Sequence, residues 1–274
     1  RDKSVRAWKT VAKDQQEKSA FRMSAYAGMI DRVDQKIGDL IAALKKNGDF
    51  ENTLILFLAD NGACAEGPLL GEGDPVADRT TTDSWVRPRY GKVWANASAT
   101  PYRLYKHYAH EGGSNTPFIA HWPAQIKQGR DWFREPAQLI DVMATLSDVT
   151  GATYPITFKG HEITKPDGIS LLPAFQKNTL KRTSPIFIEH ENNAFVRDGK
   201  WKLVGRNVSP ADGLKPKRWE LYDMSTDGTE LNNLAATKPI KVKSMSDAWK
   251  RWAKEAKVYP KRLTKEKKSN NKKP

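Results

Sequence analysis

Apolar residues recur at steps of three and four between Tyr26 and Leu44, which is the spacing of one face of an α-helix. Charged residues such as Asp31, Arg32 and Asp34 take the positions between them. The pattern predicts an amphipathic helix that ends at Asn47-Gly48, because both residues tolerate the left-handed conformation of a helix end. Residues 1 to 20 are polar and charged and predict a surface loop leading into this helix. The apolar positions are Met29, Ile30, Val33, Ile37, Leu40, Ile41 and Leu44.

The segment from Thr53 to Ala59 is continuously apolar rather than alternating. Such a run is typical of a strand covered on both faces, as in a parallel sheet flanked by helices. A second apolar strand is expected at Pro117 to Pro123, and a short helix from Gln138 to Leu146 that ends near Gly151. Residues 67 to 89, rich in Gly, Pro, Asp and Thr, predict a long irregular loop. Helix, short loop and buried strand together indicate the α/β class.

The pattern changes near residue 180. A turn and short helix are expected at Asp167 to Pro173, and short strand-like segments follow. A last helix is expected from Ile240 to Ala256. These elements predict a small antiparallel sheet with a packed helix. The strand-like segments are Pro185 to His190, Ala194 to Val204 around an Asp198-Gly199 turn, and Trp219 to Met224.

Composition indicates a globular protein, with 38% hydrophobic and 28% charged residues among 274. No apolar run approaches the length that crosses a membrane. The only cysteine, Cys64, excludes an internal disulfide framework. The formal net charge is +14, and residues 261–274 carry seven basic residues and one glutamate. This tail is expected to be disordered or to attract a polyanion, and without aromatic residues it fits an acidic polysaccharide at least as well as nucleic acid.

Candidate chemistry follows the first predicted strand. Asp60 and Asn61 offer oxygen ligands at the carboxyl end of a strand, where ligands gather in α/β sheets. Hard oxygen donors favour calcium or magnesium over zinc. Gly62 would allow the turn that both side chains need to reach one ion. Lys106 could hold an anion beside that cation, which outlines an ester-cleaving site. Without context, an Asp-Asn-Gly triplet is a common turn and a lysine is commonly solvated.

Two further groups of polar residues are candidates beside Asp60, Asn61 and Lys106. His110 is a candidate for lining the site, and Glu111 is expected to fix its loop through hydrogen bonds. His190 and Asn193, together with Glu191, lie at the end of a predicted strand in the carboxy-terminal part. They are candidates for substrate selection, and a sheet-edge turn is an equally good interpretation.

Segments spread over nearly the whole chain, in the same order, resemble the sulfatase family of the alkaline-phosphatase-like superfamily, and bacterial arylsulfatases in particular. The resemblance implies an alkaline-phosphatase-like sheet flanked by helices, present in part, with the smaller antiparallel sheet and helix behind it. It divides the chain into the carboxy-terminal part of the main α/β domain (1–180), a small subdomain (181–260) and the tail (261–274). The segments are Asp31 to Leu44, Thr53 to Gly62, Trp94 to Gly113, Pro117 to Pro123, Asp141 to Gly151, Asp167 to Pro173, Asp198 to Val204, Trp219 to Asp223 and Glu230 to Leu234.

The resemblance also implies roles. Asp60 and Asn61 would bind calcium, and Lys106 would bind the sulfate of an aryl or carbohydrate sulfate ester, which includes sulfated polysaccharide. The family's nucleophile is a formylglycine made from the cysteine of Cys-x-Pro-Ser-Arg. That motif is absent, because Cys64 is followed by Ala65-Glu66-Gly67. The chain therefore resembles the carboxy-terminal portion of a sulfatase and is expected to be inactive alone.

The resemblance further implies a periplasmic or secreted enzyme that binds no nucleic acid. Two alternatives remain. A phosphatase or phosphodiesterase of the same superfamily would typically place a histidine after the strand-end aspartate and bind two zinc ions, whereas Asn61 stands here. A non-catalytic relative would bind polyanions through its basic charge.

Overall fold

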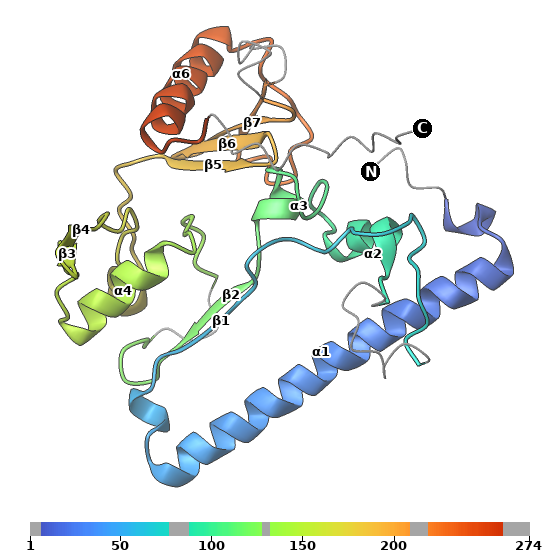
Figure 1. The fold of residues 1–274 in the computed structure, drawn as a ribbon, viewed down its shortest axis with the longest axis horizontal. Helices are drawn as coiled ribbons and strands as arrows, with labels where there is room; N and C mark the ends of the chain where they lie inside the picture. Colours follow the sequence, from blue (N-terminus) through green and yellow to red (C-terminus); the bar gives the residue numbers. More distant parts are fainter. Residues whose placement is uncertain (1–6, 77–87, 128–131, 209–218, 260–274) are drawn as a thin grey trace, which may run out of the picture. The chain divides into compact units, whose positions relative to one another are not determined.

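The computed structural model describes residues 7–76, 88–127, 132–208 and 219–259. The chain forms two compact units, Arg1–Ile186 and Phe187–Pro274 (Figure 1). The basic tail expected at 261–274 lies outside the described residues, as does the part of the expected irregular loop from 77 to 87. No helix in the described ranges combines the length and the apolar character needed to cross a membrane.

The first α-helix of the first unit is the predicted helix, α1, which spans Lys13–Asn47 and is followed by Gly48 with φ of 82°. It starts well before Tyr26, so the expected surface loop up to residue 20 is wrong over 13–20. A tertiary contact explains the difference. The indole nitrogen of Trp94 donates to the carbonyl and hydroxyl oxygens of Ser19, at 2.9 and 3.0 Å, and Ser19 is fully buried. This contact stabilises polar early turns that show no apolar periodicity.

Two strands of the first unit pair side by side, β1 (Ile55–Leu58) and β2 (Phe118–His121) (Figure 1). Both strands were expected. They pair antiparallel, with Leu56 opposite Ala120, whereas the run from Thr53 to Ala59 was compared with a strand of a parallel sheet. A continuous apolar run predicts burial and carries no information on the direction of the neighbouring strand. The pairing continues past β1, because the amide of Ala59 donates to the carbonyl of Pro117 at 3.2 Å.

Short elements complete this unit. The expected helix near 138–146 is α4 and starts at Asp141, a buried residue whose carboxylate accepts from the Gln138 and Ile169 amides and pairs with Arg182. The end of α4 at Gly151 and the short helix after Asp167 were expected. The sequence did not predict the helices α2 and α3 or the hairpin β3–β4. The elements are η1 (Trp8–Thr10), η2 (Phe50–Asn52), α2 (Gly91–Ser98), α3 (Glu111–Ser114), α4 (Asp141–Thr150), α5 (Leu172–Lys177), β3 (Thr157–Phe158) and β4 (His161–Glu162).

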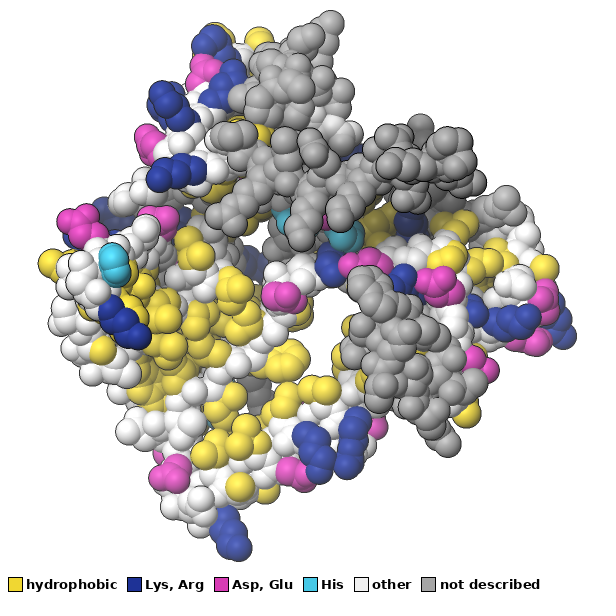
Figure 2. All heavy atoms as spheres, viewed as in Figure 1, with side chains coloured by type: hydrophobic (Ala, Val, Ile, Leu, Met, Phe, Trp, Pro, Cys, Tyr) yellow, Lys and Arg dark blue, Asp and Glu magenta, His cyan; other side chains and the backbone are white. Residues whose placement is uncertain are grey.

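Large apolar side chains remain exposed on several elements of the first unit. On the face shown in Figure 2 they gather over the region of α4 and β1–β2. Phe57 on β1 is 42% exposed, although this strand was expected to be covered on both faces, and Ile119 on β2 is 58% exposed. The exposed apolar residues on the helices include Phe21, Met29, Ile30, Val33 and Leu40 of α1 and Met143 and Leu146 of α4.

The second unit is a four-stranded sheet in the order β5-β6-β7-β8, with helix α6 (Pro239–Glu255) beside it (Figure 1). The antiparallel sheet and its helix were expected and are confirmed. The indole nitrogen of Trp249 donates to the carbonyl of Ile188 at 3.0 Å, which fixes the helix against the sheet. The strands are β5 (Ile186–His190), β6 (Asn193–Asp198), β7 (Trp201–Gly205) and β8 (Trp219–Asp223).

The core of this unit lies between the sheet and α6. It joins alternate strand residues such as Val196 and Leu221 to Met245 and Trp249 of the helix, all at most 3% exposed. A buried ion pair accompanies this core, because Lys202 Nζ lies 2.9 Å from Glu230 Oε1 and both side chains are at most 1% exposed.

Candidate active site

The chain leaving β1 lies directly against the segment that carries Lys106. The amide of Gly62 donates to the carbonyl of Gly113 at 3.0 Å, and the amide of Lys106 donates to the carbonyl of Ala63 at 3.1 Å. These two bonds join residues that are more than forty positions apart in the sequence. The two segments singled out by sequence therefore form one region of the first unit.

Close backbone packing explains why glycine occupies three positions here. A Cβ atom on Gly62 would lie 2.0 Å from the Gly112 carbonyl oxygen. A Cβ on Gly112 would lie 2.1 Å from the carbonyl oxygen of Leu104, and one on Gly113 would lie 2.1 Å from that of Tyr108. Gly62 was expected to supply conformational freedom, but its φ is not in the left-handed region. Its role is instead to let two backbones approach closely.

Asp60 and Asn61 follow β1 at the start of this region, with Asp60 exposed and Asn61 half-buried. The negative charge of Asp60 acts on the ammonium of Lys106. The pKa of the Lys106 ammonium is raised, chiefly by its hydrogen bond to Glu66 and, among smaller causes, by the charges of Glu66 and Asp60. The carboxylate of Asp60 therefore lies within electrostatic reach of the ammonium, so these two predicted site residues belong to one neighbourhood.

Glu66 was not singled out by sequence, yet it is the direct partner of Lys106. Its Oε1 accepts a hydrogen bond from Lys106 Nζ at 2.8 Å, and the Nε2 of His107 lies 3.6 Å from the same oxygen. Its Oε2 accepts from the Cys64 thiol at 2.6 Å. The bonds from Cys64 and then Lys106 lower the pKa of Glu66 to about 2. Forty residues separate Glu66 from Lys106, so no local pattern could have indicated the pair.

Cys64 does not fit the precursor of a formylglycine. It lies in Cys-Ala-Glu-Gly rather than Cys-x-Pro-Ser-Arg. Burial, followed by its hydrogen bond to Glu66, raises the pKa of the thiol. Cys64 is thus held as a neutral hydrogen-bond donor, and no reaction step is assigned to it.

The backbone around Lys106 adopts uncommon conformations. Leu104 has φ of 63° and His107 has φ of 80°, in the left-handed region that non-glycine residues seldom occupy. Between them, Tyr105 is buried against Ala65 and Ala95. Such strain persists only where the surroundings fix it, and it is concentrated at functional sites.

His110 and Glu111 occupy different environments. The side chain of His110 is fully buried, and its carbonyl accepts from the Gly113 amide at 2.8 Å. Oε2 of Glu111 accepts from the side-chain amide of Asn115 at 2.9 Å, which ties the first turn of α3 to the residue after it. The assignment of His110 to the site stays a prediction.

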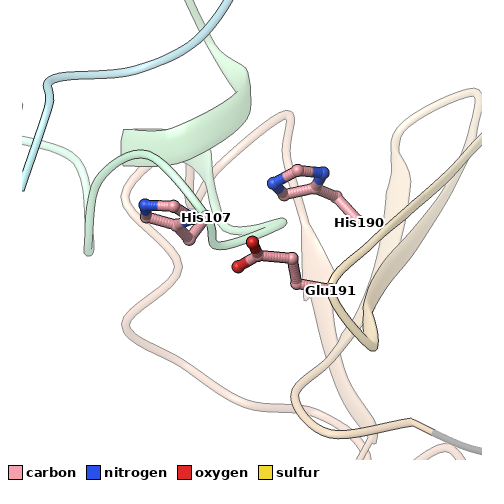
Figure 3. Close-up of side chains that lie close together, drawn as sticks. All are labelled: His107, His190 and Glu191. Atoms are coloured by element: carbon pink, nitrogen blue, oxygen red, sulfur yellow. The ribbon is translucent and has the colours of Figure 1, made fainter. Parts of the chain in front are cut away.

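The substrate-selection candidates belong to the second unit. His190 ends β5 and is exposed, while Asn193 begins β6 and is 7% exposed. Glu191 and Asn192 connect them with φ of 52° and 64°, as a tight two-residue hairpin turn requires. Figure 3 shows His190 and Glu191 at this turn; His107, also labelled, belongs to the first unit. This placement agrees with the sheet-edge turn, and the role in substrate selection stays a prediction.

The donor set after β1 fits a hard divalent cation. Asp60 and Asn61 offer carboxylate and amide oxygens, the atoms that Ca²⁺ prefers. Ca²⁺ takes about six to eight oxygen ligands, so these two residues supply only part of a coordination sphere.

Comparison with known proteins identifies the family of this chain. Residues 3–152, more than half of the chain, match the family model described as Sulfatase. The chain belongs to the sulfatase family. Residues 102–255 of this sulfatase chain also match the model for the carboxy-terminal part of N-sulphoglucosamine sulphohydrolase. The resemblance seen in the sequence is thereby confirmed.

Among its relatives, an uncharacterized sulfatase of Schizosaccharomyces pombe is 30% identical over 263 residues, which cover 89% of this chain and 46% of that protein. The arylsulfatase of Klebsiella aerogenes is 34% identical over 152 residues, covering 53% of this chain and 32% of the enzyme. The chain therefore spans less than half of the length of these curated relatives.

A solved structure supports the fold. The crystal structure of Ps i-CgsB superposes with a TM-score of 0.61 at 26% identity, covering 89% of this chain and 44% of that one. The same protein has been crystallised in complex with k-i-k-neocarrahexaose. This likeness confirms the expected α/β fold of the sulfatase type, present in part.

Proposed function

We propose that this chain supplies the metal-binding and sulfate-binding edge of a sulfuric ester hydrolase acting on aryl or carbohydrate sulfate esters. The observation that carries the proposal is the convergence of Asp60, Asn61 and Lys106 in one region, held by backbone hydrogen bonds between distant segments. Membership of the sulfatase family supports sulfate as the group transferred.

Each side chain has a defined task in this proposal. Asp60 and Asn61 would contribute oxygen ligands to calcium, which would supply positive charge to the sulfate oxygens. The ammonium of Lys106 donates hydrogen bonds to those oxygens and stabilises the negative charge that grows in the transition state. A preorganised donor of this kind gains strength in a site that excludes water. The formylglycine nucleophile has no candidate in this chain, and we place it in a part of the enzyme outside these 274 residues.

A structural relative suggests the substrate class. The neocarrahexaose complex of a structural relative favours a carbohydrate sulfate, including sulfated polysaccharide. His190 and Asn193 are the residues that we assign to substrate selection. A periplasmic or secreted location fits such a substrate.

The principal test is the substitution Lys106→Ala in the full-length sulfatase. Turnover of 4-nitrophenyl sulfate should fall about a hundredfold or more, the typical loss for one preorganised charge contact. Lys92→Ala, on the exposed side of α2, is the matched control and should leave turnover unchanged. An unchanged rate in Lys106→Ala would remove this residue from the site.

Two controls test the wider assignment. Hydrolysis of 4-nitrophenyl phosphate in preference to the sulfate would favour the phosphatase alternative. The 274-residue chain alone should show no turnover, and measurable sulfate release by it would contradict the location assigned to the nucleophile.

A further inference from the structure

The carboxylate of Glu66 is the meeting point of three side chains. Oε1 accepts from Lys106 Nζ at 2.8 Å and lies 3.6 Å from His107 Nε2, while Oε2 accepts from the Cys64 thiol at 2.6 Å. Both carboxylate oxygens are thus engaged by groups of the candidate active site. A solvated glutamate with no task would not require this arrangement.

The pair with Lys106 is less exposed than an ion pair between neighbouring turns of one helix. Lys36 and Asp39, one helical turn apart on α1, have side chains 58% and 69% exposed. Lys106 and Glu66 are 29% and 42% exposed and lie forty residues apart. The backbone hydrogen bond from the Lys106 amide to the Ala63 carbonyl fixes the same two segments. The segments are therefore held in place independently of the ion pair.

This geometry limits where the ammonium can go. A lysine side chain has four flexible carbon–carbon bonds, so an unanchored Nζ samples many positions. The ammonium carries three N–H donors, and the bond to Glu66 uses one of them. The other two can then be directed toward an anion while Nζ stays in place. The Cys64 thiol, in turn, restrains the carboxylate that does the anchoring.

We infer that Glu66 is a positioning residue for sulfate ester hydrolysis, which holds the ammonium of Lys106 in the orientation that the transition state needs. This inference rests on the proposed function, because Lys106 must bind the sulfate. Glu66 acts through Lys106 and does not contact the substrate. Its loss should therefore affect the chemical step more than the binding of substrate.

The test is a double-mutant cycle in the full-length enzyme with 4-nitrophenyl sulfate. Glu66→Ala should lower kcat at least tenfold while KM changes less than threefold. Glu66→Gln keeps the length and one oxygen acceptor, so its kcat should lie between those of the wild type and Glu66→Ala. In the Lys106→Ala background, Glu66→Ala should change kcat less than twofold, because the group that it positions is gone.

Glu72→Ala is the matched control. Glu72 is also half-exposed, but it pairs with Arg89 at 3.0 Å rather than with Lys106, and its loss should leave kcat and KM unchanged. A Glu66→Ala enzyme with wild-type kcat would overturn the inference. So would equal losses from Glu66→Ala in the wild-type and Lys106→Ala backgrounds, which would indicate a structural role only.

A wild-type enzyme that hydrolyses no sulfate ester would overturn the proposed function instead. The inference about Glu66 can then be tested without turnover, by recording the ammonium signal of Lys106 with ¹H–¹⁵N NMR in the 274-residue chain. Positioning by Glu66 requires a slowly exchanging ammonium signal in the wild type that is lost in Glu66→Ala. The same signal in both proteins would show that Glu66 does not hold Lys106.

Discussion

Replacing Gly62 with alanine tests the backbone contact that brings the chain after β1 to the Lys106 segment. The added Cβ would lie 2.0 Å from the Gly112 carbonyl oxygen and 2.8 Å from the Gly113 Cα. Both neighbours are backbone atoms, so no side chain can rotate away to make room. Because φ at Gly62 is not in the left-handed region, alanine adds crowding without backbone strain of its own.

The magnitude follows from two contributions. Forcing an extra methyl group into a packed region costs about 1–3 kcal/mol. Separating the segments also weakens the bond from the Gly62 amide to the Gly113 carbonyl, worth about 1 kcal/mol. The free energy of local opening should therefore fall by about 2–4 kcal/mol. At about 1.4 kcal/mol for each tenfold change, this corresponds to about 30- to 700-fold faster amide exchange.

Native-state hydrogen exchange on the 274-residue chain measures this effect at a defined reporter, the amide of Lys106 bonded to Ala63. Gly28→Ala in α1 is the control, because its Cβ would have no neighbour within 4 Å. Alanine also favours a helix over glycine by about 1 kcal/mol, so protection at Lys106 should not fall in this variant. Protection at Lys106 that stays within threefold of wild type in Gly62→Ala would refute the close-packing argument.

Three further substitutions probe the metal site and the second unit. Asp60→Ala in the full-length enzyme should lower bound calcium together with turnover; metal analysis showing full occupancy would contradict its role as a ligand. Lys202→Met removes the ammonium from the buried Glu230 carboxylate and should cost about 3–5 kcal/mol in urea unfolding, so a loss below about 1 kcal/mol would show that the pair is dispensable. Trp249→Ala removes the fully buried indole and its bond to Ile188, and a loss of about 3–5 kcal/mol is expected; an unchanged midpoint of thermal unfolding would argue against this core.

The second unit could be predicted in detail because its pairing is local. β5 and β6, and likewise β6 and β7, are joined by connections of two residues each. The turn at Asp198-Gly199 is visible in the sequence, and Gly199 has φ of 53°. The apolar positions of the last helix also fit one buried face. Local signals of this kind fix strand bounds to within a residue or two.

The structure of the first unit was harder to predict from the sequence, because its elements depend on contacts between distant residues. The early turns of α1 depend on Trp94, which is 75 residues from Ser19, and no local pattern encodes such a contact. The hairpin β3–β4 has two-residue strands with exposed side chains, too short to show alternation. In the candidate site, the residue types singled out Asp60, Asn61 and Lys106 as candidates. Sequence analysis did not single out Glu66, because only the folded chain brings it to Lys106.

The exposed apolar side chains of α1 affect how this protein has to be handled. Met29 is 60% exposed and Leu40 is 53% exposed, both on a helix that was expected to bury that face. Contiguous patches of this type promote self-association in water. The isolated chain should therefore scatter light and bind hydrophobic dyes as its concentration rises, and exchange experiments on it require dilute samples.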